Sequence, residues 1–328
     1  MTNSLDFVSA PVDIETFIKD PQYLGGVLCD GIYPYWLEQL KKIYEQPAVS
    51  QYNEILLAGA LGAGRSLAAI VGFLYELYIV TLAKDPHKTW VLLPTTRIEL
   101  AIITAGDNCN TLLADRILDC INLSPYFKSI LLPNKGDALE SDMFPNHIGI
   151  TFKHRGFLGK AIFGAIVDDS CFPQEQPLCD KWLGAITELY VTIWRRSFAR
   201  FGGMGRSRMW LAVSSDSPLY SLVEARRKYG EGGTGVFYVA PSIWEVQAFK
   251  KVYCGDTFSV FVGSDTEQPR IVTDIEDLVK HKDKIIQVPV EYHPDFEQGI
   301  STALQELGGI PLTSIHSQNR CNSQQREN

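Results

Sequence analysis

Small and polar residues at one point of the chain have the types and spacing of a phosphate-binding loop. Residues 59–66 read Gly-Ala-Leu-Gly-Ala-Gly-Arg-Ser and match the pattern G-x-x-x-x-G-K-[ST], except that Arg65 stands where lysine is expected. Glycines let successive backbone N–H groups face phosphate oxygens, and the Ser66 hydroxyl can bind Mg²⁺. The spacing therefore predicts a nucleotide-binding site formed by Gly59, Ala60, Leu61, Gly62, Ala63, Gly64, Arg65, Ser66 and Leu67.

Two adjacent carboxylates follow the apolar run Ala161–Val167. In nucleotide hydrolases that carry such a loop, an aspartate at the end of a strand of this kind lies near the metal, and the next acidic residue orients the attacking water. We therefore expect Asp168 to serve Mg²⁺ together with Ser66, and Asp169 to position the water. Glutamate is usual at the position of Asp169. Aspartate is shorter by one CH₂, so reaching the water requires a small shift of this residue. The alternative interpretation is a strand end followed by a polar turn.

A second apolar run, 210–213, ends in Ser214 and Ser215. In motor ATPases a strand end of this type can sense the γ-phosphate and pass its loss to the next domain. We assign these two serines a coupling role. A plain serine turn explains the residues equally well.

Positive charge gathers between residues 195 and 228, although the chain as a whole has a net charge of −8. The cluster indicates either contact with the phosphate backbone of duplex DNA, through Arg206 and Arg208, or an arginine that stabilises transition-state charge. For the second role the candidates are Arg196 and Arg200, which are four residues apart and share a helix face. A solvated surface is the alternative.

The elements that must position these residues alternate along the chain. Apolar runs predict strands over 54–58, 98–105, 148–152, 161–167 and 209–213, and helices over 66–83, 109–123 and 180–200. This order indicates an α/β fold with a mostly parallel sheet flanked by helices. The apolar segment 67–83 is better explained as a core helix than as a membrane span, because Glu76 interrupts it and spanning helices need about 20 residues.

Composition and texture divide the chain into four parts. Residues 1–48 resemble a lead-in of short helices, 49–240 the nucleotide-binding core, 241–316 an appended subdomain, and 317–328 a polar, disordered tail. After about residue 235 the pattern changes, and the runs 236–239, 258–262 and 285–288 are short and β-like; the last two fall in the appended subdomain. The 7 scattered cysteines include no CxxC pair, which favours reduced thiols inside a cell.

Taken in order, these features resemble the ATPase domain of the large subunit of tailed-phage DNA-packaging terminases. The likeness covers roughly residues 20–310. It includes segments outside the loop and the acidic strand, namely 20–25, 32–36, 124–127, 158–160, 286–296 and 303–309.

The resemblance implies a P-loop NTPase fold with an additional strand, and an ATP- and Mg²⁺-dependent motor that moves double-stranded DNA into a procapsid. The partners it implies are DNA, the portal protein and procapsid, the small terminase subunit and a homo-oligomeric ring, in the cytoplasm of an infected bacterium and away from membranes. The family usually adds a C-terminal nuclease domain, which this chain lacks, so we expect no nuclease activity. Because Arg65 and Asp169 depart from the family pattern, the alternative is a nucleotide-binding scaffold or regulatory protein without efficient hydrolysis. A P-loop helicase or kinase fits less well.

Overall fold

The computed structural model describes residues 6–28, 31–46, 51–104, 112–133, 143–153, 160–171, 180–201, 207–231, 235–250 and 253–311. The chain divides into two compact units. Unit 1 takes the described parts of Met1–Leu57, Gly64–Val213 and Ser221–Tyr238; unit 2 takes those of Ala58–Ala63, Ser214–Tyr220 and Val239–Asn328. Each unit is described by itself.

A six-stranded parallel sheet forms the centre of unit 1, with the strand order β3-β2-β4-β5-β1-β6. Its strands are almost wholly apolar, which is typical of parallel sheets covered on both faces. β5 lies between β1 and β4, so the strand before the glycine loop and the strand before the acidic pair are not direct neighbours. The strands are β1 Glu54–Leu57, β2 Ile98–Ile103, β3 Ile148–Lys153, β4 Ala161–Asp168, β5 Met209–Ala212 and β6 Val236–Val239.

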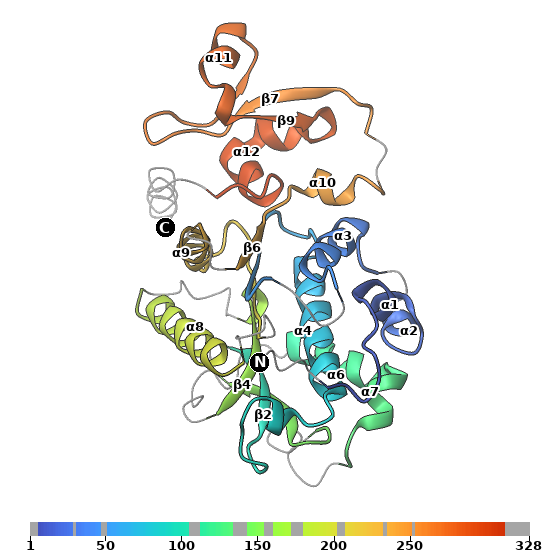
Figure 1. Cartoon of the computed structure of the whole chain (residues 1–328). Helices are drawn as coiled ribbons and strands as arrows, with labels where there is room; N and C mark the ends of the chain where they lie inside the picture. Colours follow the sequence, from blue (N-terminus) through green and yellow to red (C-terminus); the bar gives the residue numbers. More distant parts are fainter. Residues whose placement is uncertain are drawn as a thin grey trace. The chain divides into compact units, whose positions relative to one another are not determined.

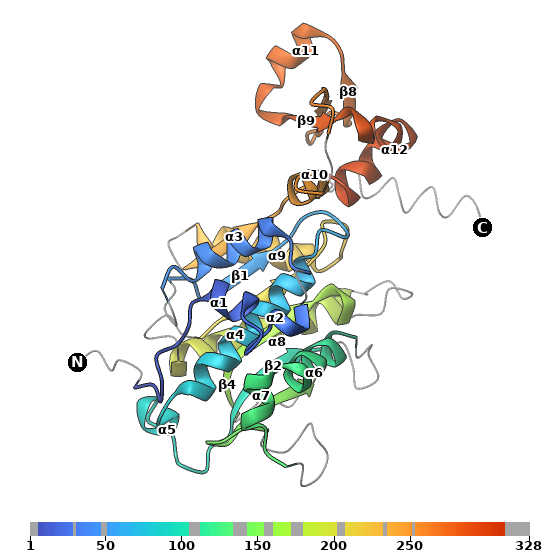
Figure 2. The same cartoon turned by 90° about the vertical axis from the view of Figure 1, so that its right-hand side faces the viewer.

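Helices cover both faces of this sheet (Figure 1). α4 and the small helices around it lie on one face, and α8 and α9 lie on the other; Figure 2 views the molecule from the α4 side. Local signals set several helix starts: Pro34 opens α3 with its fixed φ angle, and the Ser124 hydroxyl caps α7. The helices are α1 Ile14–Lys19, α2 Gly25–Leu28, α3 Pro34–Ile43, α4 Arg65–Leu82, α5 Pro86–Thr89, α6 Leu112–Leu123, α7 Pro125–Ile130, α8 Asp180–Phe201 and α9 Tyr220–Gly230.

α4 is the central helix of the core. Among the described residues it is the one helix long and apolar enough to cross a membrane, and 83% of its apolar window is buried inside the protein, as expected of a core helix. Gly72 lets α4 approach the sheet closely, because a Cβ atom there would come within 2.1 Å of the Trp210 ring on β5. The close contact of α4 with β5 and β4 holds the start of α4 next to the strand ends.

Two buried ion pairs connect helices to the sheet. The Arg208 guanidinium donates to Glu76 of α4, and the Tyr44 hydroxyl donates to the same carboxylate. The Arg226 guanidinium of α9 binds both oxygens of Glu54 on β1. Burial raises the pKa of Glu76, and Arg208 opposes that shift by favouring the charged form.

Unit 2 contains a three-stranded antiparallel sheet with the order β8-β7-β9, formed by β7 Thr257–Phe261, β8 Arg270–Val272 and β9 Ile285–Pro289. Its helices are α10 Ile243–Gln247, α11 Ile275–Lys280 and α12 His293–Glu306. α12 packs on the small sheet through Phe296, whose ring lies 5.4 Å from that of Phe258 on β7. A capping box between Ser242 and Glu245 begins α10.

The α/β fold and the parallel sheet predicted from the sequence are confirmed, and so are the helices over 66–83 and 180–200 within a residue or two. The run 236–239, which falls inside the predicted core 49–240, forms β6, the edge strand beside β1, because backbone bonds such as Ala58 N–H to Val239 O join the two strands. The predicted disordered tail, 317–328, lies outside the described residues.

We expect Glu76→Ala to lower the free energy of unfolding by about 3–5 kcal/mol, because it leaves the buried Arg208 guanidinium without its carboxylate. Urea unfolding followed by circular dichroism measures this loss. The matched control is Glu15→Ala, which removes a carboxylate from the exposed pair with Lys19 and is expected to change stability by less than about 1 kcal/mol. Equal effects of the two substitutions would contradict a structural role for the buried pair.

Candidate nucleotide-binding site

The register of three parallel strands brings the candidate residues to one edge of the sheet. Leu57 at the end of β1 and Asp168 at the end of β4 both pair with Ala212 at the end of β5. The segments that follow these residues therefore leave the sheet at the same level. They are the segments in which the sequence places the phosphate loop, the acidic pair and the two serines.

The loop between β1 and α4 has the backbone conformation that its glycines were expected to permit. Gly59, Gly62 and Gly64 have φ angles of 110°, 68° and 80°, in the positive-φ region that residues other than glycine rarely adopt. α4 begins at Arg65, directly after the left-handed Gly64. In unit 1, Tyr33 and Trp36 pack over Gly64, where a Cβ atom would come within 3.2 Å of the Tyr33 ring. This aromatic cover was not predicted from the sequence.

Ser66 and Asp168 come together within unit 1. Oδ1 of Asp168 accepts a hydrogen bond of 2.9 Å from the Ser170 backbone N–H, and the Ser66 hydroxyl lies close enough to lower the pKa of the Asp168 carboxyl. Desolvation by burial, helped by the neighbouring Asp169, outweighs both effects and raises that pKa overall. Oδ2 of Asp168 is buried and finds no hydrogen-bond partner among the described residues.

A buried carboxylate oxygen without a partner, beside a serine hydroxyl, is a donor set that suits Mg²⁺, which prefers oxygen ligands and commonly uses one or two carboxylates. The cation would also give the buried Asp168 carboxylate a positively charged partner. Among the described residues no group of three or more histidine, cysteine, aspartate or glutamate side chains forms a denser metal site. The residues present therefore fit the predicted metal.

Arg65 and Asp169 form an ion pair. Nη2 of Arg65 lies 3.1 Å from Oδ2 of Asp169, and their side chains are only 7% and 20% exposed. The two residues that depart from the expected loop and strand patterns thus bind each other. The sequence gave them separate roles, on phosphate and on water, and did not reveal the pairing because they are 104 positions apart.

In unit 2 the first half of the loop is held by protein carbonyls. The backbone N–H groups of Ala60 and Leu61 donate to Pro241 O and Glu306 O, at 3.0 and 2.8 Å. These two N–H groups are occupied by protein carbonyls and are therefore not available to a phosphate. The Ser215 hydroxyl donates to Gln305 O at 2.5 Å, so the end of α12 contacts both the loop and one of the predicted coupling serines.

The predicted basic residues do not gather at this edge. Arg208 is 1% exposed and bound to Glu76, which corrects its assignment to DNA binding, because a buried guanidinium cannot contact a DNA backbone. Arg206 lies outside the described residues. Arg196 and Arg200 line a cavity beside Ile162, near the first residue of β4. Ile162 and Asp168 are six strand residues apart, or about 20 Å. Arg196 and Arg200 therefore cannot stabilise charge beside the acidic pair of their own chain.

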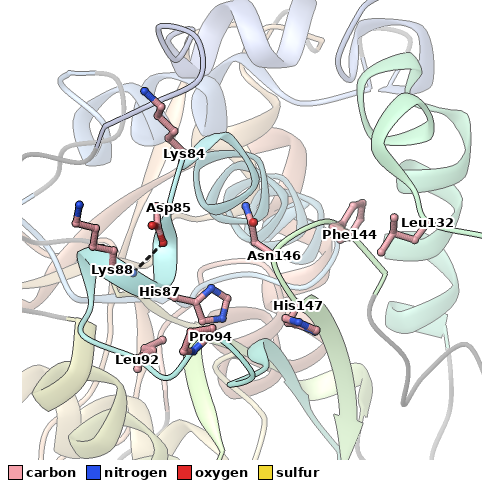
Figure 3. A pocket seen from close by; sticks show the side chains of 10 residues that line it. All are labelled: Lys84, Asp85, His87, Lys88, Leu92, Pro94, Leu132, Phe144, Asn146 and His147. Atoms are coloured by element: carbon pink, nitrogen blue, oxygen red, sulfur yellow. Dashed lines mark hydrogen bonds between the residues drawn. The ribbon is translucent and has the colours of Figure 1, made fainter.

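A second cavity, of about 740 Å³, also lies away from the candidate residues (Figure 3). Lys84, Asp85, His87 and Lys88 contribute from the segment after α4, and Asn146 and His147 from the turn before β3. Asn146 and His147 both have positive φ angles, 61° and 54°. None of the predicted site residues lines this cavity.

No family model and no curated protein sequence matches this chain. The case for a function is therefore built on the geometry of the site and on the motifs of the sequence.

We expect Gly309→Ala to lower the free energy of unfolding by about 2 kcal/mol or more. A Cβ atom at Gly309 would lie 2.8 Å from Ala60 N, Gly59 Cα and Pro241 O, all of them backbone atoms that no rotamer change can move. The control is Gly255→Ala, since Gly255 also has a positive φ angle but has no atom within 4 Å of the added methyl group. Chemical unfolding of both variants compares them. Similar losses would contradict the close packing of residue 309 on the loop.

We expect Asp168→Asn to raise stability at neutral pH in metal-free buffer. The raised pKa means that burial disfavours the ionised carboxylate, and asparagine keeps the shape of the side chain while removing the charge. Urea unfolding in the presence of a chelator measures the change, and the exposed Asp265, changed to asparagine, is the control. A loss of stability in Asp168→Asn would show that the charge contributes favourably to the metal-free protein.

Proposed function

We propose that this chain is an ATP-hydrolysing motor domain of the viral DNA-packaging type. The observation that carries the proposal is the meeting of Ser66, at the start of α4, with the buried and partly unsatisfied Asp168 carboxylate at the end of β4. The three left-handed glycines and the placement of β5 between β1 and β4 support it. The extension to DNA packaging rests on the resemblance of the sequence to terminase large subunits.

In this proposal the backbone N–H groups from Gly62 to Ser66 and the positive end of α4 hold the phosphates. Ser66 and Asp168 hold Mg²⁺, which neutralises charge on the phosphate oxygens. Asp169 is the group that accepts a proton from the attacking water. The side chain of Arg65, at the first position of α4, supplies a second positive charge to the phosphates.

The Arg65–Asp169 ion pair gives these roles an order. While the pair is intact, the Asp169 carboxylate is engaged with Arg65. A triphosphate in the loop competes for the Arg65 guanidinium, since phosphate is itself a bidentate partner for arginine. Transfer of Arg65 to phosphate then breaks the ion pair, so that Asp169 turns from Arg65 to water only when substrate is present.

Within unit 2, the contacts of α12 indicate how a change at the first half of the loop reaches this helix. Glu306 O accepts the Leu61 N–H, and Gln305 O accepts the Ser215 hydroxyl. Both bonds end on adjacent residues at the carboxyl end of α12. A shift of the loop, or of the turn that contains Ser215, would therefore move the same part of this helix. We assign the coupling role to Ser215 on this basis. Ser214 is buried beside it.

The second candidate function is a nucleotide-binding scaffold without efficient hydrolysis. The same ion pair favours it, because an aspartate that remains bound to Arg65 cannot activate water. The two candidates predict the same affinity for ATP and differ in turnover.

We expect wild-type protein with Mg²⁺ to release phosphate from ATP, and Asp169→Ala to lower the rate by roughly 10²- to 10⁴-fold, the usual contribution of a general base. Nucleotide binding should persist in Asp169→Ala, because the Asp169 carboxylate no longer competes with phosphate for the Arg65 guanidinium. A phosphate-release assay measures turnover, and calorimetric titration with a non-hydrolysable ATP analogue measures binding.

The control is Asp265→Ala, which removes an exposed carboxylate of unit 2 and should leave both readouts unchanged. Wild-type protein that binds nucleotide without turnover, with and without duplex DNA, would favour the scaffold. Wild-type protein that binds no nucleotide would exclude both candidates.

A further inference from the structure

A cavity of about 460 Å³ lies where the first residues of β4 meet the last turns of α8, within unit 1. Three of its lining side chains are cationic, namely Lys160, Arg196 and Arg200. Trp90, Ile162 and Ala199 complete it, and no carboxylate is among the described residues that line it. A volume of this order suits a small ligand or a part of a larger one.

The described residues neutralise the positive charge of this cavity only in part. Lys160 donates to both oxygens of Glu99 at 2.9 Å, so one cation is paired. Arg196 and Arg200 are exposed, and among the described residues no hydrogen bond or ion pair of their side chains is seen. Like charges at positions i and i+4 of a helix repel each other, and this repulsion is relieved when an anion lies between them.

The end of α8 accounts for only part of this charge. A cation in the last turn of a helix complements the partial negative charge of its carboxyl end, and Arg200 is in that position. Arg196 lies one turn earlier, and Lys160 comes from a different part of the chain. The charge at the end of α8 therefore does not explain why Lys160, Arg196 and Arg200 line the same cavity.

The apolar part of the cavity strengthens the field of the cations. The Trp90 ring packs against Phe163 and Phe201, with ring centroids 5.1 Å apart in each case. Trp90 is 9% exposed and lines the cavity, so this wall is a largely buried aromatic cluster. Charges of one sign beside a low-dielectric wall focus the potential and attract counter-ions.

This cavity is separate from the candidate nucleotide site. It lies at the amino end of β4, whereas Asp168 is the last residue of that strand, about 20 Å away by strand length. A ligand here therefore does not compete with one at the glycine loop.

We propose that Lys160, Arg196 and Arg200 form a second phosphate-binding site, which takes either the backbone phosphates of a nucleic acid or a free polyphosphate. Arginine pairs bind phosphate oxygens bidentately, and the exposed face of α8 leaves the cavity open to a ligand that extends beyond it. The site does not depend on the function proposed for the loop, and its test requires no nucleotide turnover.

The test compares Arg196→Ala/Arg200→Ala with Lys42→Ala/Lys128→Ala. The control pair removes the same charge from exposed positions on α3 and α7, outside the basic cluster 195–228, and neither residue lines the cavity. Fluorescence anisotropy with labelled duplex DNA, between about 50 and 200 mM salt, gives the affinity and its salt dependence. Thermal unfolding with sodium tripolyphosphate reports binding of free polyphosphate.

If nucleic acid is the ligand, the Arg196/Arg200 variant binds DNA roughly tenfold or more weakly, and its slope of log affinity against log salt is flatter by about 2, because each lost phosphate contact contributes about 0.9. If free polyphosphate is the ligand, the DNA data match the control, and only the stabilisation by tripolyphosphate is reduced. Tripolyphosphate bound at the glycine loop contributes equally to both variants. The proposal is overturned if both variants behave alike with both probes, or if wild-type protein binds neither.

Discussion

In-register pairing of β1, β5 and β4 is the constraint on which the candidate site depends. Leu57, Ala212 and Asp168 lie at one level because parallel strands were joined in that register and in that order. A shift of one residue would turn every side chain of a strand to the opposite face. The buried ion pairs Glu76–Arg208 and Glu54–Arg226 tie helices to the first residues of β1 and to the residue before β5, and thereby help to fix the register. Ion pairs at the amino ends of the strands therefore help to position the residues at their carboxyl ends.

The negative charges of Asp168 and Asp169 at the carboxyl edge are only partly compensated by protein groups among the described residues. Asp169 has Arg65 as its partner, whereas Asp168 is buried with one oxygen unsatisfied and a raised pKa. In the proposed function a divalent cation would relieve this cost, since it matches the oxygen donors present. The arginine that replaces lysine in the loop is long enough to reach across to the acidic pair. The two unusual residues are therefore best understood together.

Local and pairwise features of this fold differ in how far sequence could predict them. The glycine spacing predicted the tight loop between β1 and α4, in which Gly59, Gly62 and Gly64 have positive φ angles, and apolar runs predicted most strands of the main sheet. These signals are carried by neighbouring residues. Contacts between distant segments gave no such signal. The pairing of Arg65 with Asp169, the burial of Arg208 and the bonds from the end of α12 to the loop all depend on the tertiary arrangement. Charge clustering along the chain was the weakest guide, since it grouped Arg208 with Arg196 although one is buried and the other exposed.

The contact between Gly72 and Trp210 sets a limit on how this chain can vary. The indole ring of β5 occupies the space that any larger residue at position 72 would need, at 2.1 Å from the missing Cβ atom. Neither residue can be exchanged alone, because a larger residue 72 overlaps the ring and a smaller residue 210 leaves a cavity beside the helix. In related chains we therefore expect these two positions to change together: a larger residue at position 72 of α4 should accompany a smaller residue at position 210 of β5.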